Sequence, residues 1–259
     1  MRMIKAICIA FSTYSILPVP RFDWTEDTMR FSLCAFPLVG MLPGLGLWLW
    51  YHFCTAVNCG IMLFAALAAV LPLLLTGGIH MDGYCDTVDA LSSHRDRERR
   101  LEILKDSHLG AFAVIYCAVY LLACYGLYTE LANETALIIV GIGFVLSRSL
   151  AALSAIITPN ARGTGMLMAF TQHAEKHLSL ALLFTALAVC TAVMLRLYPL
   201  AGGCCIGLCF TWFFLYRHMA WKQFGGITGD TTGFFLQITE LLILIGTGLA
   251  QLAARMVLG

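Results

Sequence analysis

One acidic stretch interrupts a chain that is otherwise strongly apolar. It runs from Thr76 to Gly110 and holds seven of the fifteen acidic residues. If its first part is helical, at about 100° per residue, then Asp82, Asp86 and Asp89 fall within roughly 60° of arc on one face. Like charges at this spacing repel one another and lower helix stability, so the face favours a counter-ion. Carboxylate oxygens suit a hard divalent cation, and the pattern therefore predicts a Mg²⁺ or Mn²⁺ site.

A solvated loop between two membrane spans is the alternative interpretation of this stretch. It accounts well for the basic run Arg95–Arg100. It accounts poorly for the three aspartates, because a loop that needed only solubility would not surround them with Gly77, Gly78 and Gly83. Glycines let the backbone come close to a ligand or to a neighbouring helix.

Two later loops carry polar residues that suit a phosphate ligand. The first, Thr158–Gly165, places Arg162 beside Gly163. An arginine fork matches phosphate oxygens, and glycines let backbone N–H groups approach an anion. An ordinary arginine in a flexible loop is the alternative, and the loop alone does not decide between the two.

The second loop, Gly225–Gly233, packs four glycines, three threonines and Asp230 just ahead of an apolar segment. A Gly- and Thr-rich turn that opens a helix suits phosphate or ribose contacts, so Gly226, Thr228 and Gly229 are candidate binding residues. Asp230 is either a further cation ligand or a helix cap.

Arg148 and Glu240 lie inside apolar segments, as does Gln237. Ionisable groups are costly there and usually face a partner or a water-filled cavity. An Arg148–Glu240 ion pair and a polar cavity lined by these residues are both open interpretations.

The composition excludes a soluble globular domain. The chain is 60% hydrophobic and 12% charged, with a mean hydropathy of +0.83. A net charge of +1 gives no reason to expect a nucleic-acid partner. The eleven cysteines lie mostly in apolar runs without metal-binding spacing, which favours buried thiols.

Apolar length predicts an all-α, polytopic membrane helix bundle that forms one domain over residues 1–259. We expect seven spans, and the first contains Pro37 and Pro43. The predicted spans are Ser32–Phe53, Val57–Leu75, Leu109–Tyr128, Thr135–Ile157, Leu178–Leu195, Leu200–Tyr216 and Gly233–Met256. The basic and apolar N-terminal segment imitates a signal peptide but lacks a clear cleavage site, so we expect a retained amphipathic helix at the membrane interface.

In this layout, thirteen of the sixteen basic residues fall on one side of the membrane. The positive-inside rule then places the N-terminus, the acidic stretch and both later polar loops in the cytoplasm. All the candidate site residues share that face, so we expect the active site there.

Four motifs together carry a resemblance that covers the whole chain. They are G-G-I-H-M-D-G-Y-C-D-T-V-D at Gly77–Asp89, L-K-D-S-H-L-G at Leu104–Gly110, A-R-G-T-G at Ala161–Gly165 and G-G-I-T-G-D-T-T-G at Gly225–Gly233. This pattern resembles the cobalamin synthase family, the adenosylcobinamide-GDP ribazoletransferases of bacterial inner membranes. Ala90 and Phe234 depart from it where a glycine and a small residue often stand, which affects fine geometry but leaves the polar positions intact.

The resemblance implies a Mg²⁺-dependent phosphotransfer in nucleotide-loop assembly, among the last steps of cobalamin (vitamin B12) biosynthesis. The 3′-hydroxyl of α-ribazole, or of α-ribazole 5′-phosphate, attacks the corrinoid-side phosphorus of adenosylcobinamide-GDP. GMP leaves, and adenosylcobalamin or its 5′-phosphate forms. The lipid bilayer is the other partner, and a homo-oligomer or a larger membrane assembly stays open at this point.

On this interpretation, Asp82, Asp86, Asp89 and Asp106 hold one or two Mg²⁺ ions at the diphosphate. One of these aspartates, or a metal-bound hydroxide, takes the hydroxyl proton. His80 is a candidate base or phosphate donor, with a structural histidine as the alternative.

Other residues would bind the substrates. Lys105 and Arg162 are candidates to neutralise phosphate charge. Asp230 and Glu240 are candidates to bind the nucleotide, the corrinoid or a second metal ion.

Two rival functions share some of these features. A CDP-alcohol-type phosphotransferase with a lipid acceptor would use a similar metal site, but the chain lacks the Ala-Arg pair of that family's D-G-x-x-A-R motif after Asp82-Gly83. A divalent-cation transporter would favour carboxylates at the membrane midplane, where the sequence offers Glu240 alone.

Overall fold

The computed structural model describes residues 2–131 and 133–258. Regular secondary structure in these ranges is entirely helical, as predicted. The helices are α1 (Arg2–Tyr14), α2 (Glu26–Met29), α3 (Ser32–Ala56), α4 (Ile61–Thr76), α5 (Ile79–Ser92), α6 (Arg97–Ile103), α7 (Ala111–Glu130), α8 (Glu134–Ile157), α9 (Met166–Gln172), α10 (Lys176–Leu197), α11 (Pro199–Phe224) and α12 (Gly229–Leu258).

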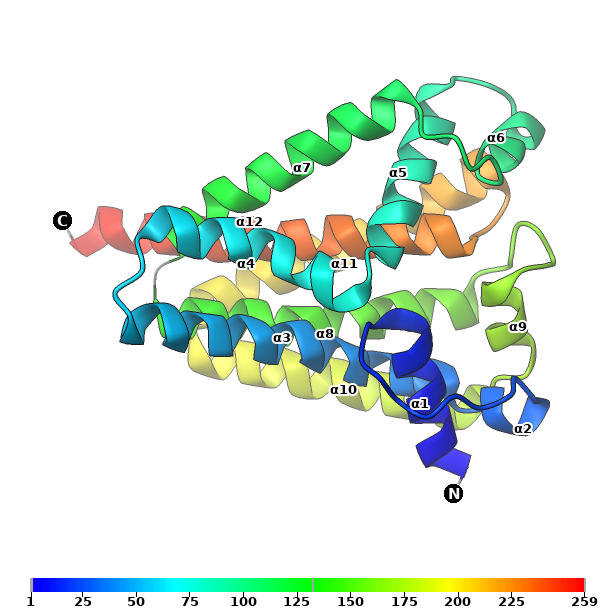
Figure 1. Ribbon diagram of the computed structural model, residues 1–259, viewed down its shortest axis with the longest axis horizontal. Helices are drawn as coiled ribbons and strands as arrows, with labels where there is room; N and C mark the ends of the chain where they lie inside the picture. The colour runs from blue at the N-terminus through cyan, green and yellow to red at the C-terminus, as the bar shows by residue number, and fades with distance from the viewer. Residues whose placement is uncertain (1, 132, 259) are drawn as a thin grey trace.

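The long helices lie side by side along the longest axis of the molecule, with α7 inclined to the rest (Figure 1). Within the described ranges, six are long and apolar enough to cross a membrane: α3, α7, α8, α10, α11 and α12. The helices α4 and α5 make a seventh span only together, and they meet at a bend of 97°. The chain is a multi-pass membrane protein, and the prediction of an all-α membrane bundle is confirmed.

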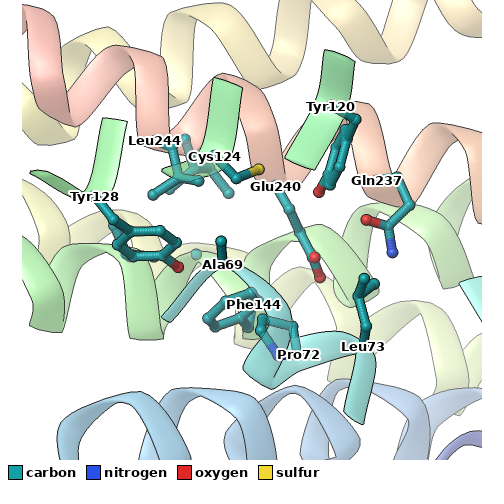
Figure 2. Close-up of a pocket in the computed structure, with 13 residues that line it drawn as sticks. Ala69, Pro72, Leu73, Tyr120, Cys124, Tyr128, Phe144, Gln237, Glu240 and Leu244 are labelled. Carbon is teal, nitrogen blue, oxygen red and sulfur yellow. The ribbon is translucent and has the colours of Figure 1, made fainter. Parts of the chain in front are cut away.

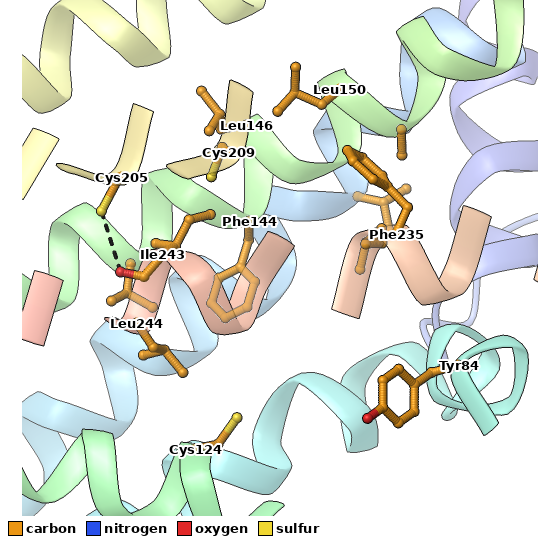
Figure 3. Packing of buried hydrophobic residues seen from close by; sticks show 14 of the residues in the cluster. Tyr84, Cys124, Phe144, Leu146, Leu150, Cys205, Cys209, Phe235, Ile243 and Leu244 are labelled. Carbon is orange, nitrogen blue, oxygen red and sulfur yellow. Dashed lines mark hydrogen bonds between the residues drawn. The ribbon is translucent and has the colours of Figure 1, made fainter. Parts of the chain in front are cut away.

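Two helices form the centre of the bundle. In the most apolar stretch of each helix, 78% is buried in α8 and 67% in α12, against 22% in α7 and 28% in α10. Figure 3 shows Phe144 of α8 and Phe235 of α12 in this core, where Cys205 of α11 donates a hydrogen bond to the Ile243 carbonyl at 3.3 Å. The outer helices leave apolar faces exposed, as helices in contact with lipid do.

Two glycines allow α3 to lie directly against α8. A Cβ on Gly40 would come 2.4 Å from the Phe144 carbonyl oxygen, and one on Gly44 would come 2.9 Å from that of Gly141. Small residues four apart let membrane helices approach backbone to backbone. This contact fixes α3 on one side of the central helix.

The N-terminal helix α1 packs across the end of α3. It buries Ala6, Ile9 and Ala10 and leaves Ile4 exposed, which is the two-faced pattern predicted for an interfacial helix. It ends at Tyr14, beside the candidate site.

The polar segments gather at one end of the bundle. The short helices α2, α6 and α9 lie at the end opposite the C-terminus, with α5 close by (Figure 1). The loop that follows α8 and the loop that precedes α12 are hydrogen-bonded to each other there. The prediction that these loops share one face of the molecule is confirmed.

Candidate active site

A pair of glycines aims the acidic helix α5 at the rest of the bundle. Gly77 and Gly78 both have left-handed backbone conformations, with φ of 64° and 74°. This conformation is readily available to glycine and costly for other residues. The two residues end α4, begin α5 and produce the 97° bend between them.

Two more glycines let α5 cross the start of α12 at close range. A Cβ on Gly83 would lie 2.8 Å from the backbone of Asp230, and a Cβ on Gly233 would lie 2.9 Å from the carbonyl oxygen of His80. The crossing brings Asp82 of α5 to the same cavity as Asp230. The glycines around the aspartates therefore serve close helix contact, one of the two uses that the sequence indicated.

The two polar loops are joined by backbone hydrogen bonds. Ala161 N–H donates to the Ile227 carbonyl at 2.8 Å, and Ile227 N–H donates to the Pro159 carbonyl at 2.9 Å. Gly226 lies close against these two hydrogen bonds, because a Cβ on it would come 2.4 Å from the Pro159 carbonyl oxygen.

The joined loops place Arg162 beside Asp230. Arg162 Nη2 lies 3.0 Å from Asp230 Oδ2, and both side chains are partly exposed (18% and 25%). The neighbouring turn is held by Asn160, whose Oδ1 accepts from the N–H groups of Arg162 and Gly163. Gly163 itself is exposed, while Arg162 lines a cavity.

This cavity has a volume of about 330 Å³ and lies where six helices meet. Its walls come from α1, α3, α5, α8, α9 and α12, from the loop after α8 and from Thr228 before α12. They include Tyr14, Leu33, Phe36, His80, Asp82, Ala151, Ala152, Ala155, Arg162, Thr228, Gly229, Asp230 and Leu236. Five predicted site residues besides Arg162 thus meet here: His80, Asp82, Thr228, Gly229 and Asp230.

Thr228 also caps α12. Its hydroxyl accepts from Thr231 N–H at 3.2 Å, and Thr228 N–H donates to Thr231 Oγ1 at 2.9 Å. A threonine at this position satisfies otherwise unpaired amides of the first turn. Asp230, in that first turn, is left free to pair with Arg162.

Asp86 extends the acidic cluster. It lies one helical turn after Asp82, within Coulombic range of Asp82, Asp230 and Arg162. Three carboxyl groups outnumber the single Arg162 guanidinium, and oxygen donors of this kind suit Mg²⁺. In the described part of the chain, no three His, Cys, Asp or Glu side chains already stand in a metal-binding arrangement. The donor chemistry fits the ion, and side-chain rotation would have to gather the oxygens around it.

Asp89 has a contact that the sequence did not indicate. Its carboxylate oxygens accept from Gly110 N–H at 2.7 Å and Ala113 N–H at 2.9 Å. A carboxylate here satisfies free amides and complements the positive end of the helix dipole. Asp89 thus anchors the start of α7 to α5, and its catalytic and metal-binding roles stay predictions.

Lys105 and Asp106 lie on the exposed connection between α6 and α7 and are not among the cavity walls. Asp106 Oδ1 is 2.6 Å from His108 Nδ1 and also accepts from the His108 backbone N–H. The hydrogen bond from the His108 ring holds the pKa of the Asp106 carboxyl below its usual value. The structure does not bring either residue to Asp82, and their roles at the site stay predictions.

Glu240 lies deeper in the bundle, about 15 Å along α12 from Asp230 at the usual helical rise. Its Oε1 pairs with Arg148 Nη1 at 2.8 Å, and the two side chains are only 5% and 1% exposed. Figure 2 shows Glu240 in a separate small cavity with Gln237, Tyr120 and Tyr128. The ion pair is therefore present, whereas the cavity that Glu240 and Gln237 line has mostly apolar walls and does not include Arg148, and the binding role of Glu240 stays a prediction.

Sequence analysis missed the apolar wall of the larger cavity. The rings of Tyr14 and Phe36 and the small side chains of Ala151, Ala152 and Ala155 form it. The alanines stand close together in the second half of α8, among Ser149 and Ser154, which is a weak signal of space. Nothing local indicated that α1 and α3 would face α5.

A family model described as cobalamin-5-phosphate synthase matches residues 6–248 of the chain. This match covers almost the whole bundle and every candidate site residue. The chain belongs to the cobalamin-5-phosphate synthase family.

Curated relatives agree with this family. The chain is 40% identical to an adenosylcobinamide-GDP ribazoletransferase of Lachnoclostridium phytofermentans, over 98% of this chain and 96% of the relative. It is 34% identical to the protein of that name from Desulfitobacterium hafniense (93% and 94% covered) and 33% identical to that from a Geobacillus species (87% and 88% covered). No solved structure matches the chain.

Proposed function

We propose that this chain is a transferase that joins adenosylcobinamide-GDP to α-ribazole or α-ribazole 5′-phosphate. Relatives that bear the name adenosylcobinamide-GDP ribazoletransferase align with it over nearly their whole length. The structural observation that carries the proposal is the meeting of Asp82, Asp230 and Arg162 at one cavity.

The proposed reaction is a displacement at phosphorus. The ribazole hydroxyl oxygen forms a bond to the corrinoid-side phosphorus, and the bond from that phosphorus to the GMP oxygen breaks. GMP leaves with the electron pair of that bond. The hydroxyl proton passes to a carboxylate of the acidic cluster. Such a reaction depends on positioning and on neutralising phosphate charge more than on covalent chemistry.

Arg162 is the residue that we expect to bind a phosphate oxygen. Its side chain is partly exposed at the cavity, and its Nη2 is paired with the Asp230 carboxylate. A guanidinium donates paired hydrogen bonds to phosphate, and a bound phosphate would compete with Asp230 for them. That exchange would free an Asp230 oxygen.

Asp82, Asp86 and Asp230 are the residues that would hold Mg²⁺. When bound, the ion would neutralise charge on the diphosphate of the donor. Asp82 and Asp230 come from different helices, and the Gly83–Asp230 backbone contact fixes their separation. The crossing of α5 and α12 is therefore the part of the fold that would set the metal site.

We place the protein in a bacterial cytoplasmic membrane, with the site on the cytoplasmic side. Thirteen of sixteen basic residues belong to the loops and helix ends that the sequence assigns to the site's side, which supports this orientation. The donor and acceptor would then reach the site from the cytoplasm.

The test is turnover by the purified protein in nanodiscs. With Mg²⁺, adenosylcobinamide-GDP and α-ribazole, we expect release of GMP and formation of the joined corrinoid. Product from CDP-diacylglycerol, with none from adenosylcobinamide-GDP, would contradict the proposal and favour a lipid acceptor. Metal flux into sealed vesicles with no transferase product would favour a transporter.

A further inference from the structure

The larger cavity has two chemically distinct parts. The aspartates and Arg162 are exposed or partly exposed and form its mouth. One part of its remaining lining is buried and apolar, and it comes from Leu33 and Phe36 of α3 and from Ala151, Ala152 and Ala155 of α8, each at most 6% exposed. Thr164, Thr228 and Thr232 add hydroxyl groups elsewhere in the lining.

The volume limits what can enter. About 330 Å³ is at the lower end of the range for small-molecule pockets. A single nucleoside is of this size, whereas a corrin ring bearing its nucleotide is several times larger. The cavity therefore suits a nucleoside-sized group, and the much larger corrinoid of the donor would lie outside it with one of its groups at the mouth.

The buried part contains a histidine nitrogen without a partner. His80 is 5% exposed, and its Nε2 has no hydrogen bond within the described structure. The ring is held by Tyr14, stacked with centroids 5.7 Å apart, and by the edge contact with Phe36 at 5.8 Å. A buried polar atom without a partner is unfavourable, so this nitrogen favours a ligand with a matching group.

Two aromatic bases occur in the proposed substrates, and they differ in polarity. Guanine carries several donors and acceptors along its edges, which the alanine, leucine and phenylalanine walls would leave unpaired at a large cost. The benzimidazole of ribazole has an apolar benzene ring and a single free ring nitrogen, which is an acceptor. One imidazole N–H on the wall matches that one acceptor.

We propose that this cavity is the acceptor subsite and that His80 recognises the benzimidazole base. The base lies against Tyr14, Phe36 and the α8 alanines, and His80 Nε2–H donates to its free ring nitrogen. The ribose then points to the mouth, where Asp82 and Arg162 meet the donor diphosphate. This inference rests on the proposed function and specifies which substrate enters the cavity.

The test compares two acceptors that differ at one ring position. They are α-ribosyl benzimidazole and α-ribosyl indole, in which a CH replaces the free nitrogen. In full-length parent protein in nanodiscs, the benzimidazole riboside should have a kcat/KM roughly 2- to 12-fold higher, the range expected from one hydrogen bond. His80→Leu should reduce this ratio to about 1, and His80→Gln, whose amide still donates, should keep part of it.

The ratio is measured within one variant, so a loss of folded protein does not alter it. An unchanged ratio in His80→Leu would overturn the role of His80. A parent that forms no product would instead mean that the proposed function has failed. Equilibrium dialysis would then measure the binding of the two ribosides to the parent and to His80→Leu. The same preference for the benzimidazole riboside in both proteins would overturn the role of His80 in the subsite.

A second pair of variants tests the location. Ala155→Leu fills the apolar part and should raise the KM for the acceptor roughly tenfold, the scale of a one-group misfit in an apolar pocket. The KM for the corrinoid donor should stay within about twofold. Ala136→Leu makes the same change on α8 at a buried position that is not among the cavity walls. An increase confined to the donor KM, or equal effects in both variants, would overturn the assignment.

Discussion

The protein contains two arginine–carboxylate pairs that look alike in distance and differ in setting. Arg162–Asp230 spans 3.0 Å at the cavity mouth, and Arg148–Glu240 spans 2.8 Å in the bundle centre. The first is partly exposed, and the second is 1% and 5% exposed. A partly solvated pair can open to admit phosphate at small cost, whereas a buried pair cannot separate without leaving a charge in an apolar interior. The comparison therefore assigns substrate binding to the Arg162–Asp230 pair and stabilisation of the fold to the Arg148–Glu240 pair.

The largest effect on stability should follow from breaking the buried pair. Arg148→Met leaves Glu240 without its partner and should lower the free energy of unfolding by about 3–5 kcal/mol. Asp230→Asn, at the partly exposed pair, should change it by less than about 1 kcal/mol. Denaturant unfolding in detergent measures both. Equal destabilisation by the two variants would remove the distinction between the pairs.

The next effect should come from the crossing that builds the exposed site. Gly83→Ala puts a Cβ 2.8 Å from the Asp230 backbone and should cost about 1–3 kcal/mol, with a matching loss of turnover. Gly207→Ala is the control, because a Cβ there meets nothing within 4 Å. Wild-type turnover in Gly83→Ala would show that the site still works when α5 and α12 lie further apart, and would contradict this prediction.

A smaller effect should follow at the α5–α7 junction. Asp89→Ala removes two hydrogen bonds from the start of α7 and should cost about 0.5–2 kcal/mol. If Asp89 serves only as this anchor, the KM for Mg²⁺ should stay at its parent value. A rise in that KM of tenfold or more would instead support the predicted metal role of Asp89.

The smallest effects should come from the exposed connection. Lys105→Gln and Asp106→Asn should each leave turnover within about twofold of the parent, because neither side chain is among the cavity walls. Initial-rate measurements at saturating substrates check this. A large loss in either variant would mean that this connection closes over the bound substrates.

Much of the fold could be predicted because membrane spans depend on local composition. Apolar length indicated the six long helices and a seventh span where α4 meets α5, and the distribution of basic residues indicated that the polar loops share one end. The glycines around the aspartates indicated close approach, and the structure shows α12 as the neighbour of α5. Each of these features can be read from residue types along the chain, without knowledge of which distant segments touch.

The rest depends on contacts between distant segments. Asp89 shares a helix face with Asp82, but it caps α7 because Gly110 is folded against it. Glu240 lies on the same helix as Asp230, yet the rise along α12 places its side chain in the centre of the bundle. The apolar part of the cavity combines α1, α3 and α8, and no local pattern specifies that meeting.

The most direct test of the central claim is turnover of Asp82→Asn as a function of Mg²⁺ concentration. Asp23→Asn, an exposed aspartate away from the cavity, is the matched control. We expect Asp82→Asn to insert and fold normally but to lose at least about 100-fold in ribazole transfer, since it removes charge where phosphate is neutralised. Asp23→Asn should match the parent. Parent-like turnover of Asp82→Asn across the Mg²⁺ range would contradict the placement of the active site at this cavity.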